Sequence, residues 1–545
     1  MKVHAAIAKA LVDNGVDTMF GLIGDGNLFM VDRWVNDYEH TRWIAVAQEA
    51  ASVLAANGYA NFTGKVGVAT VTHGPALTNT VTALVEGVKG RTPILVIAGD
   101  TAVVDKYNFQ NVPQRDVVLA TGAGFEQMRS PATAVEDVAF AYRRAFNERR
   151  PVVLNMPYEF QWEDVEYKAA DFGALERQAI QPDPAALDRA VGMIATAQRP
   201  IVLAGRGATS VEARAALLAL ADRLGAPVAT TLKAKDLFRD EPYDLGIFGT
   251  LSHPVAVDTI LAADCIIAFG AGLNRWTAAE GSYLADKRVV HVDTDTERLG
   301  YYFKADAGIV GDAKSVADAI VGYLDEAEVE PTGFRTPELA QRLSEYSLGG
   351  HEDLSTDTTV DLRTAILAFD AAVPRDHILV FDGGRFIFDS FTMFRVPDPR
   401  SFLLTINFGS IGLGLSNAIG AATAQPDRMV LHVAGDGGFM LGGLTEFSTA
   451  CRNGLDIVTI VFNDDSYGAE HIQFRTRDLD PTLSLHNWPD LAPVADALGG
   501  QGVTIRNLKD LDSIPEIIAN RTKPLLFDVK IDPDHVTRPD SVSAH

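Results

Sequence analysis

The chain has 545 residues with 72 acidic and 47 basic side chains, a formal net charge of −25, and it contains no cluster of Lys and Arg. This charge argues against a nucleic acid or an anionic membrane as partner, while 47% apolar residues over such a length indicate a globular protein of several domains. Cys265 and Cys451 are the only cysteines, which argues against a disulfide framework. The N-terminus has the pattern of an amphipathic helix instead of a signal peptide, and no apolar run is long enough to span a membrane. We therefore expect a soluble, cytoplasmic protein.

Short apolar runs rich in Val and Ile alternate with helical stretches along most of the chain. The predicted strands lie at 66–72, 93–99, 151–157, 200–208, 265–272, 289–295, 378–384, 429–438, 457–464 and 525–531. Runs that are apolar on both faces and separated by helices indicate buried parallel sheets in an α/β protein.

Two polar stretches, 161–185 and 325–358, interrupt this alternation and carry charge together with Gly or Pro. Such composition is typical of linkers. The sequence therefore predicts three α/β domains, at 1–165, 183–325 and 355–545.

The sequence GDGG at 435–438 ends one predicted strand and precedes a helix. In an open parallel sheet, the carboxyl ends of the strands line the ligand crevice. Glycines there let backbone N–H groups face a phosphate, and Asp436 can hold a divalent cation that bridges phosphate oxygens.

A second polar group, Asn463-Asp464-Asp465, ends the next predicted strand. The 25 residues between Gly437 and Asn463 leave room for one helix and one strand. Two neighbouring strand ends would then bring oxygen ligands to one crevice, which predicts a site for a hard cation. The alternative is a pair of acidic turns without a ligand.

These two motifs resemble the fingerprint of the thiamine diphosphate-dependent enzymes, in which GDG is followed after some 25 residues by a pair of Asn. Three further segments resemble the family: 46–60, 72–79 and 409–421. The family includes enzymes similar to pyruvate decarboxylase, benzoylformate decarboxylase and acetolactate synthase. The resemblance implies a pyrimidine-binding domain, a central nucleotide-fold domain and a diphosphate-binding domain, each built on a doubly wound parallel sheet.

The resemblance assigns roles around the two rings of the cofactor. Glu49 matches the glutamate that binds N1′ of the aminopyrimidine and so activates thiazolium C2. The alternative interpretation is a glutamate on an exposed helix face, and the apolar residues around Glu49 argue against it. Ile411 matches the bulky residue that bends the cofactor, and the carbonyl of Gly409 matches the acceptor for the 4′-amino group. Ile411 could equally be an ordinary core residue.

The remaining cofactor contacts concern the diphosphate and Mg²⁺. The resemblance places these contacts at Gly383, Gly384, Arg385, Gly437, Gly438 and Tyr467, and the metal ligands at Asp436, Asp464 and the Ser466 carbonyl. Arg385 is either a phosphate partner or a surface salt bridge. Asp464 departs from the family pattern, because it places a carboxylate where an amide is usual, and Mg²⁺ accepts both.

Two carboxylates and two histidines are candidates for proton transfer. Asp25 and Glu470 resemble the paired acids of pyruvate-type decarboxylases, although Asp25 could be a turn residue. His73 and His471 are the candidate histidines, and His73 could also be structural. The decarboxylases' adjacent histidine pair is missing; Gln110, in a Phe-Gln pair, resembles the acetohydroxyacid synthases instead.

The resemblance implies an enzyme that acts on a 2-oxo acid or acyloin through an enamine. Paired acids favour non-oxidative decarboxylation with carboligase activity. An acetolactate synthase-like acyl transferase is the alternative, and a catalytically silent cofactor-binding subunit is a third. The family also implies a homodimer or homotetramer with active sites between subunits; the substrate stays open.

The central domain carries only weak signals. Residues 205–210, GRGATS, keep two of the three glycines of a dinucleotide loop, and 270–277 with 292–295 occupy the place where relatives hold FAD or ADP. A purely structural fold is favoured over a bound nucleotide.

Overall fold

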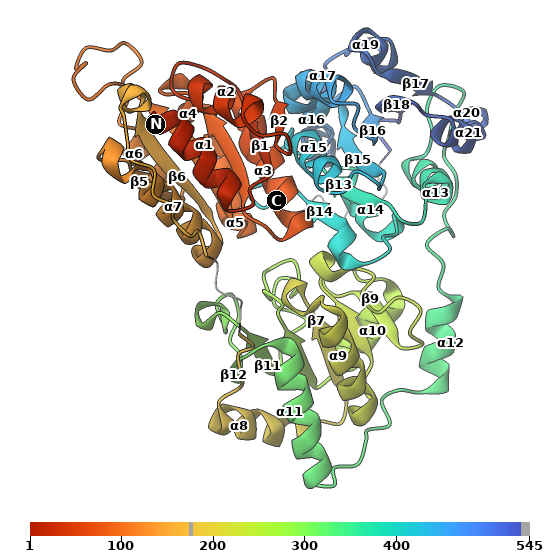
Figure 1. Ribbon diagram of the computed structural model, residues 1–545. Helices are drawn as coiled ribbons and strands as arrows, with labels where there is room; N and C mark the ends of the chain where they lie inside the picture. Colours follow the sequence, from red (N-terminus) through yellow and green to blue (C-terminus); the bar gives the residue numbers. More distant parts are fainter. Residues whose placement is uncertain (174–177, 536–545) are drawn as a thin grey trace.

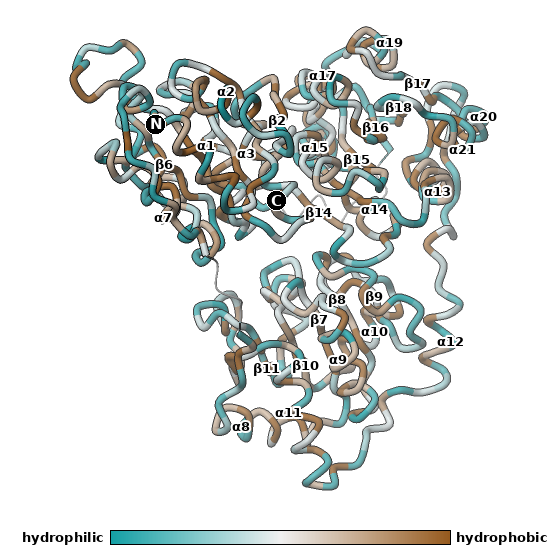
Figure 2. The backbone as a smooth tube through the Cα atoms, in the orientation of Figure 1, coloured by the Kyte–Doolittle hydropathy of each residue, from teal (hydrophilic) through white to brown (hydrophobic). Residues whose placement is uncertain are grey.

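The computed structural model describes residues 1–173 and 178–535 and contains three parallel β-sheets of six strands each (Figure 1). Each sheet is formed by one continuous stretch of the chain and carries helices on both faces. The predicted class, three doubly wound parallel sheets, is therefore confirmed. Because a parallel sheet is covered on both sides, its strands are apolar throughout, and Figure 2 shows hydrophobic residues gathered along them.

The first sheet has the order β2-β1-β3-β4-β6-β5. Its strands are β1 (Thr18–Gly21), β2 (Arg42–Ala45), β3 (Gly67–Val71), β4 (Ile94–Asp100), β5 (Gly124–Gln127) and β6 (Pro151–Pro157). Its helices are α1 (Val3–Asp13), α2 (Leu28–Asn36), α3 (Glu49–Thr63), α4 (Pro75–Thr78), α5 (Val81–Gly90), α6 (Gln114–Ala120) and α7 (Ala134–Glu148).

The central sheet has the order β12-β11-β10-β7-β8-β9. Its strands are β7 (Pro200–Ala204), β8 (Val228–Thr230), β9 (Asp244–Ile247), β10 (Cys265–Phe269), β11 (Arg288–Asp293) and β12 (Ala307–Val310). Around it lie α8 (Pro184–Ala195), α9 (Val211–Leu224), α10 (Pro254–Ala262) and α11 (Ala313–Glu326), with the 3₁₀ turns η3 (Arg206–Ala208) and η4 (Leu232–Ala234) after β7 and β8.

The third sheet has the order β14-β13-β15-β16-β18-β17. Its strands are β13 (Ile378–Phe381), β14 (Phe402–Leu404), β15 (Val430–Gly435), β16 (Ile457–Asn463), β17 (Gln501–Ile505) and β18 (Leu525–Lys530). Its helices are α13 (Leu362–Ala372), α14 (Ile387–Met393), α15 (Gly414–Ala424), α16 (Asp436–Gly438), α17 (Leu444–Arg452), α18 (Gly468–Thr476), α19 (Leu491–Ala497), α20 (Leu508–Leu511) and α21 (Ile514–Ala519), and the π-helical turn η7 (Phe439–Gly443) joins α16 to α17.

Strand order reverses direction near the middle of each sheet, and these switch points coincide with the loops singled out in the sequence. The reversal lies between β1 and β3 in the first sheet, between β7 and β10 in the central one, and between β13 and β15 in the third. At a switch point the loops after the two strands diverge and leave a crevice at the carboxyl edge of the sheet. The GDGG motif follows β15, so it lies at such a crevice.

The first and third domains share one hydrophobic core, in which α3 packs against α15. Glycines permit the close approach: a Cβ on Gly58 would lie 2.1 Å from the Asn417 oxygen, and one on Gly420 would lie 1.9 Å from the Ala55 oxygen. The Asn57 amide donates to Asn417 Oδ1 at 2.7 Å in the same interface. The central domain has cores of its own and lies beneath the other two in Figure 1.

Several strands escaped prediction, and one linker contains a helix. The missed strands, β1, β2, β5, β8, β9, β12, β14 and β17, have three to five residues each, and most lie at sheet edges. The predicted linker at 325–358 was wrong in part, because α12 (Pro337–Glu345) lies within it. The Thr336 side chain caps this helix and Pro337 begins it, a start signal that the sequence displays. Residues 174–177 of the other predicted linker lie outside the described residues.

Over residues 1–173 and 178–535, no helix combines the length and the apolar character needed to cross a lipid bilayer.

Candidate active site

The switch point of the third sheet opens into a cavity of about 540 Å³. Its wall is formed by the loops after β13, β15 and β16, by the 406–411 loop and by the start of α18. It contains these residues predicted from the sequence: Gly383, Gly384, Arg385, Gly409, Ile411, Asp436, Gly437, Gly438, Asp464, Ser466, Tyr467 and Glu470. The fold thus brings residues as far apart in the sequence as Gly383 and Glu470 to one place.

Asp436 and Asp464 form a buried acidic pair at the floor of this cavity. The backbone N–H of Ser466 donates to Asp436 Oδ2 at 3.1 Å and to Asp464 Oδ1 at 3.1 Å, and the Ser466 hydroxyl donates to Asp464 Oδ1 at 2.8 Å. Burial, together with the negative charge of Asp464, raises the pKa of the Asp436 carboxyl. A divalent cation between the two carboxylates would remove this repulsion.

The protein ligands available for a cation are few. Within 1–173 and 178–535 no group of three or more His, Cys, Asp and Glu side chains is arranged to hold a metal. Two carboxylates would leave other coordination positions to a backbone carbonyl, water and phosphate oxygens. Mg²⁺ is commonly bound in this way, by one or two carboxylates together with substrate or cofactor phosphates.

Arg385, directly after β13, is paired with the acidic pair. Its Nε lies 2.5 Å from Asp464 Oδ2, and the two side chains are 11% and 5% exposed. The guanidinium also donates to the backbone oxygens of Asp532, Pro533 and His535. The surface salt bridge considered from the sequence is therefore wrong, because this ion pair is buried. Asp464, the carboxylate that departs from the family pattern, is therefore paired with the positive charge of Arg385.

Glycine is required where α18 begins beside this ion pair. A Cβ on Gly468 would lie 2.4 Å from Asp464 Oδ2 and 2.6 Å from Arg385 Cδ. Gly437 is confined in a similar way, since its Cβ would lie 2.7 Å from the ring of Tyr467. The Tyr467 ring thus covers the GDGG turn.

Asp382, which the sequence analysis missed, anchors the loop that carries Gly409 and Ile411. Its carboxylate accepts from the backbone N–H of Gly383 at 2.7 Å and of Gly412 at 3.0 Å. Burial raises the pKa of Asp382 to about 6. An acid at the end of a predicted strand, just before two glycines, was the signal that could have revealed it.

The π-helical turn η7 brings the GDGG helix against the same loop. Gly442, within η7, meets Gly412 so closely that a Cβ on it would lie 2.1 Å from the Gly412 oxygen. Gly412 has φ +83°, in the left-handed region that favours glycine. A π-turn inserts an extra residue into a helix and is frequent at functional sites.

His471 does not line the cavity. Its Nδ1 lies 2.9 Å from Ser484 Oγ, its Nε2 lies 2.9 Å from Asp534 Oδ1, and the side chain is 3% exposed. These contacts tie α18 to the segments that follow it. The structure thus separates His471 from Glu470, which lines the cavity and is exposed.

Asp25 and His73 lie together at the other predicted half-site, the switch point of the first sheet. They follow β1 and β3, and a Cβ on Gly26 would lie 3.2 Å from His73 Nδ1. His73 is 3% exposed and stacks on Tyr158 at 5.9 Å, a setting that fits a structural residue, whereas Asp25 is exposed.

Gln110 and Glu49 complete this half-site. The Gln110 backbone packs on Gly74, where a Cβ would lie 2.4 Å from the Gln110 oxygen. Glu49 is the first residue of α3, and its Oε2 accepts from the Asn79 amide at 3.0 Å. In the single chain Glu49 is only partly buried, contrary to the enclosed setting that its apolar neighbours suggested.

Glu446 on α17 holds the backbone that leads into Glu49. Its Oε1 accepts from the N–H groups of Ala47 and Gln48 at 3.0 and 3.1 Å. Glu446 is fully buried, and burial raises its pKa. Nothing in the sequence pattern had pointed to it, because the contact joins residues about 400 positions apart.

Comparison with known families gives three matches along the chain. Residues 1–120 match the N-terminal TPP binding domain of thiamine pyrophosphate enzymes, 187–320 match the central domain, and 382–529 match the C-terminal TPP binding domain. The three matches follow one another in this order over most of the chain. The chain belongs to the thiamine pyrophosphate enzyme family.

Relatives within this family extend over nearly the whole chain. A probable acetolactate synthase large subunit of Methanocaldococcus jannaschii is 27% identical over 98% of this chain and 92% of its own length. A sulfoacetaldehyde acetyltransferase of Rhodobacter capsulatus is 28% identical over 94% of this chain and 90% of its own. An acetolactate synthase large subunit of Parasynechococcus marenigrum is 29% identical over 97% and 87%.

The residues of the third domain fit the family's cofactor. The buried acidic pair suits the cation, and Arg385 adds a positive charge. The helical run that starts at Asp436 directs its first N–H groups to the crevice, which favours phosphate. Gly383 and Gly384 add backbone at the opposite wall.

In the central domain, the glycine loops pack on each other. A Cβ on Gly205 would lie 2.3 Å from the Gly270 oxygen, and one on Gly207 would lie 2.9 Å from the Gly270 Cα. Asp295 forms a 2.9 Å ion pair with Arg91 of the first domain. Close packing thus accounts for these glycines. A purely structural central domain, favoured from the sequence over one that binds FAD or ADP, stays a prediction.

Proposed function

We propose that this protein is a thiamine diphosphate- and Mg²⁺-dependent enzyme that cleaves and forms the C–C bond next to the carbonyl of a small 2-oxo acid or acyloin. Non-oxidative decarboxylation coupled to carboligation is the leading reaction. The observation that carries the proposal is the cavity with the buried pair Asp436 and Asp464 at a switch point of the third sheet. The identity of the cofactor is inferred from membership of the thiamine pyrophosphate enzyme family.

The residues of the chain divide the work. Thiamine diphosphate supplies, when bound, a nucleophilic carbon and a sink for the electrons of the broken bond. Asp436, Asp464 and the Ser466 carbonyl hold the cation, and Gly383, Gly384, Gly437 and Gly438 offer backbone donors to the diphosphate. Ile411 would support the cofactor from the wall of the cavity; it packs next to Gly383, where a Cβ would lie 3.2 Å from Ile411 Cγ2.

Proton transfer is assigned to the two ends of the site. Glu49 polarises the aminopyrimidine. Glu470 lines the cavity and is free to deliver a proton to product, which favours release of an aldehyde. Asp25, which is exposed, would complete the set from the first domain; His73, buried against Tyr158, would have a structural role beside it.

An acyl transferase is the second candidate. Two observations favour it: relatives named acetolactate synthase and sulfoacetaldehyde acetyltransferase, and the Phe109-Gln110 pair on an exposed loop. In that case the acyl unit passes to a second acceptor before it is protonated.

We infer that the active site requires two copies of the chain. Among the described residues, 1–173 and 178–535, the cavity is lined by residues between 362 and 535, and none of Asp25, Glu49, His73 and Gln110 of the same chain reaches it. The loop after β4 projects from the first domain (Figure 1) and exposes Val104, Tyr107 and Phe109 by 88–94%. Large exposed apolar side chains of this kind mark protein contacts.

Complementation tests this arrangement. Glu49→Gln and Asp436→Ala each remove one half of the site, so each homodimer is expected to be inactive. Mixed dimers regain one intact site, and random exchange would restore about a quarter of wild-type activity. If the mixture of the two variants stays inactive although subunit exchange has been verified, both halves of the site come from one chain.

A panel of 2-oxo acids identifies the reaction. Pyruvate, a branched-chain and an aromatic 2-oxo acid are incubated with the holoenzyme, and CO2 and organic products are measured. Aldehyde release or acyloin formation supports the leading proposal. Transfer to a 2-oxo acid or to phosphate, or flavin absorbance near roughly 450 nm in the purified protein, supports the second.

A further inference from the structure

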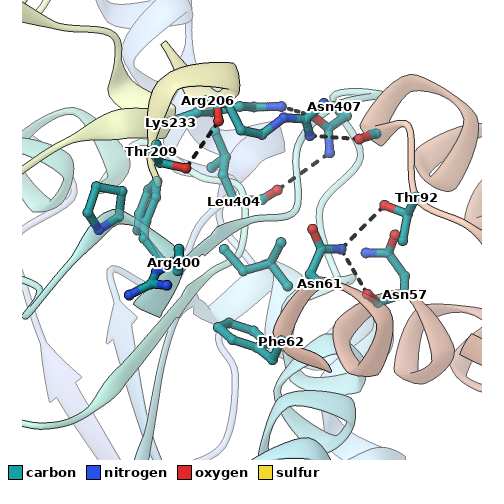
Figure 3. A pocket seen from close by; sticks show the side chains of 14 residues that line it. Asn57, Asn61, Phe62, Thr92, Arg206, Thr209, Lys233, Arg400, Leu404 and Asn407 are labelled. Atoms are coloured by element: carbon teal, nitrogen blue, oxygen red, sulfur yellow. Dashed lines mark hydrogen bonds between the residues drawn. The ribbon is translucent and has the colours of Figure 1, made fainter. Parts of the chain in front are cut away.

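A second cavity, of about 180 Å³, lies where the three domains meet (Figure 3). Its wall combines α3 and the turn after α5 from the first domain, the turns η3 and η4 from the central domain, and β14 with its flanking residues from the third. It shares no lining residue with the cofactor cavity.

Two cationic side chains of the central domain, Arg206 and Lys233, enter this cavity beside Asn407 (Figure 3). Arg206 donates to the Gly90 oxygen at 2.7 Å, and Lys233 Nζ donates to Asn407 Oδ1 at 2.5 Å. Among the residues that the structure describes, neither cation has a carboxylate within ion-pair distance. Both hydrogen-bond acceptors are neutral oxygens, so neither cation forms a direct ion pair; Glu86, which bonds Asn407, offsets the charge of Lys233 only in part.

Two carboxylates lie near the cavity, and neither forms an ion pair with Arg206 or Lys233; Glu86 acts on Lys233 only through its charge. Glu86, fully buried on α5, accepts from the backbone and side-chain N–H groups of Asn407 and from the backbone of Phe408. Arg400, the third cation of the wall, pairs with Asp398 at 3.2 Å. The wall itself contains no acidic residue, although the whole chain carries a net charge of −25.

Both cations are destabilised by their surroundings, although Lys233 is only half-buried and Arg206 is exposed by its surface area. Burial and the neighbouring charge of Arg206 lower the pKa of Lys233 to about 7. Burial and the charges of Arg149, Arg91 and Arg298 lower the pKa of Arg206 to about 10, although part of its side chain is open to solvent. An anion between the two groups would offset both effects.

We propose that this cavity binds a small oxyanion, a phosphate-type anion or a short carboxylate, between Arg206 and Lys233. Thr209 and Asn61 supply further polar groups of the wall. Cavities for drug-sized ligands usually measure about 300–1,000 Å³, so a volume of about 180 Å³ suits a small anion better than a nucleotide.

The bound anion would act on the cofactor site through one loop. Asn407 belongs to the wall of this cavity, and Ile406, Gly409 and Ile411 belong to the wall of the cofactor cavity. Lys233 holds Asn407 directly, so an anion that engages Lys233 changes the restraint on residues 406–411. The site thereby joins all three domains to the loop beneath the cofactor.

Sulfate binding to the holoenzyme tests the proposal, because thiamine diphosphate and Mg²⁺ then fill the other anion site. The melting temperature is followed during titration with sodium sulfate, against sodium chloride at equal ionic strength. We expect a saturable rise that Lys233→Met and Arg206→Gln each weaken by about tenfold or more. Lys314→Met, which removes an exposed cation of α11, serves as control and leaves the affinity unchanged. Equal affinity in wild type and both variants, or no effect beyond that of chloride, would overturn the proposal.

The pH dependence provides a second, independent readout. The charged groups around Lys233 are Arg206, Arg400 and Glu86. Since Lys233 must be protonated to bind an anion, wild-type affinity for sulfate should rise as pH falls through about 7. The Lys233→Arg variant keeps the positive charge above and below pH 7, so it should bind sulfate on both sides of that pH. The same pH profile in wild type and Lys233→Arg would contradict the proposal.

Competition identifies the class of ligand. Inorganic phosphate and acetate are titrated against bound sulfate, and stronger competition by one of them assigns the site to phosphate-type or carboxylate ligands. Displacement of sulfate by ADP at comparable affinity would assign the cavity to a nucleotide and overturn the proposal of a small oxyanion.

Discussion

Arg385 Nε lies 2.5 Å from Asp464 Oδ2, and neither side chain is more than 11% exposed. A buried charge needs a partner, since desolvation is costly. Asp464 already faces Asp436 across the Ser466 amide, so without Arg385 the site would hold two carboxylates and no positive charge. The unusual carboxylate and this arginine therefore form a unit next to the predicted diphosphate.

The first prediction separates the members of this unit. Asp464→Asn keeps an oxygen ligand and releases the charge of Arg385 toward the diphosphate, so thiamine diphosphate should bind as well as in wild type or more tightly. Arg385→Met should weaken binding, by about tenfold, because two carboxylates then face the diphosphate. Titration of the cofactor-free protein with thiamine diphosphate at fixed Mg²⁺ measures both effects. Collapse of binding in Asp464→Asn would refute the assignment; the exposed Arg395→Met serves as control.

The second prediction concerns Glu49, which begins α3 and is held by Asn79. Glu49→Gln keeps the shape of the side chain and removes the carboxylate to which we assign the activation of the aminopyrimidine. Turnover should fall at least about a thousandfold, roughly 4 kcal/mol of barrier, with cofactor affinity little changed. Steady-state rates and a cofactor titration test this, with exposed Glu39→Gln as control. Near-normal turnover in the variant would exclude this role.

The third prediction tests Asp382 as a positioning residue. Asp382→Ala leaves the N–H groups of Gly383 and Gly412 without their acceptor in a buried place. Each unsatisfied group costs about 1–3 kcal/mol, so the melting temperature and the cofactor affinity should both fall. Thermal unfolding and thiamine diphosphate titration measure this. If affinity is unchanged while the melting temperature falls, Asp382 supports the fold and not the 409–411 loop.

The fourth prediction follows from the ionisation of Asp382. Burial raises its pKa from 3.8 to about 6, so the folded chain holds a proton that the unfolded chain releases earlier. The stability from this group is complete below about pH 3.8 and is lost as pH rises through about 6. Asp382→Asn cannot ionise, so its melting temperature relative to wild type should increase between pH 5 and 7. A constant difference across this range would show that Asp382 does not titrate there.

Part of the fold and site was readable because the signals are local. Long apolar strands such as β6 and β16 record their burial on both faces directly in their residues. The GDGG turn and the Asn463–Asp465 turn each follow such a strand, and their separation placed them at one sheet edge. Short edge strands such as β14 leave too few residues for a pattern, and they were missed.

Other features depend on contacts between distant segments. Glu446 meets the backbone before Glu49 only because α3 packs on α15 and α17 lies beside them. Likewise, His471 follows Glu470 in sequence but turns to Ser484 and Asp534, since neighbouring residues of a helix point about 100° apart.

The sequence by itself determined the three α/β domains, the cofactor family and the strand-end residues that line part of the larger cavity, because strand periodicity and strand-end motifs depend on neighbours along the chain. Only the tertiary structure decided which charges meet. It paired Arg385 with Asp464, placed Asp382 under the 409–411 loop and brought Arg206 and Lys233 into one cavity. Such contacts are set by how helices and sheets pack, and a buried charge is stable only where that packing supplies its partner.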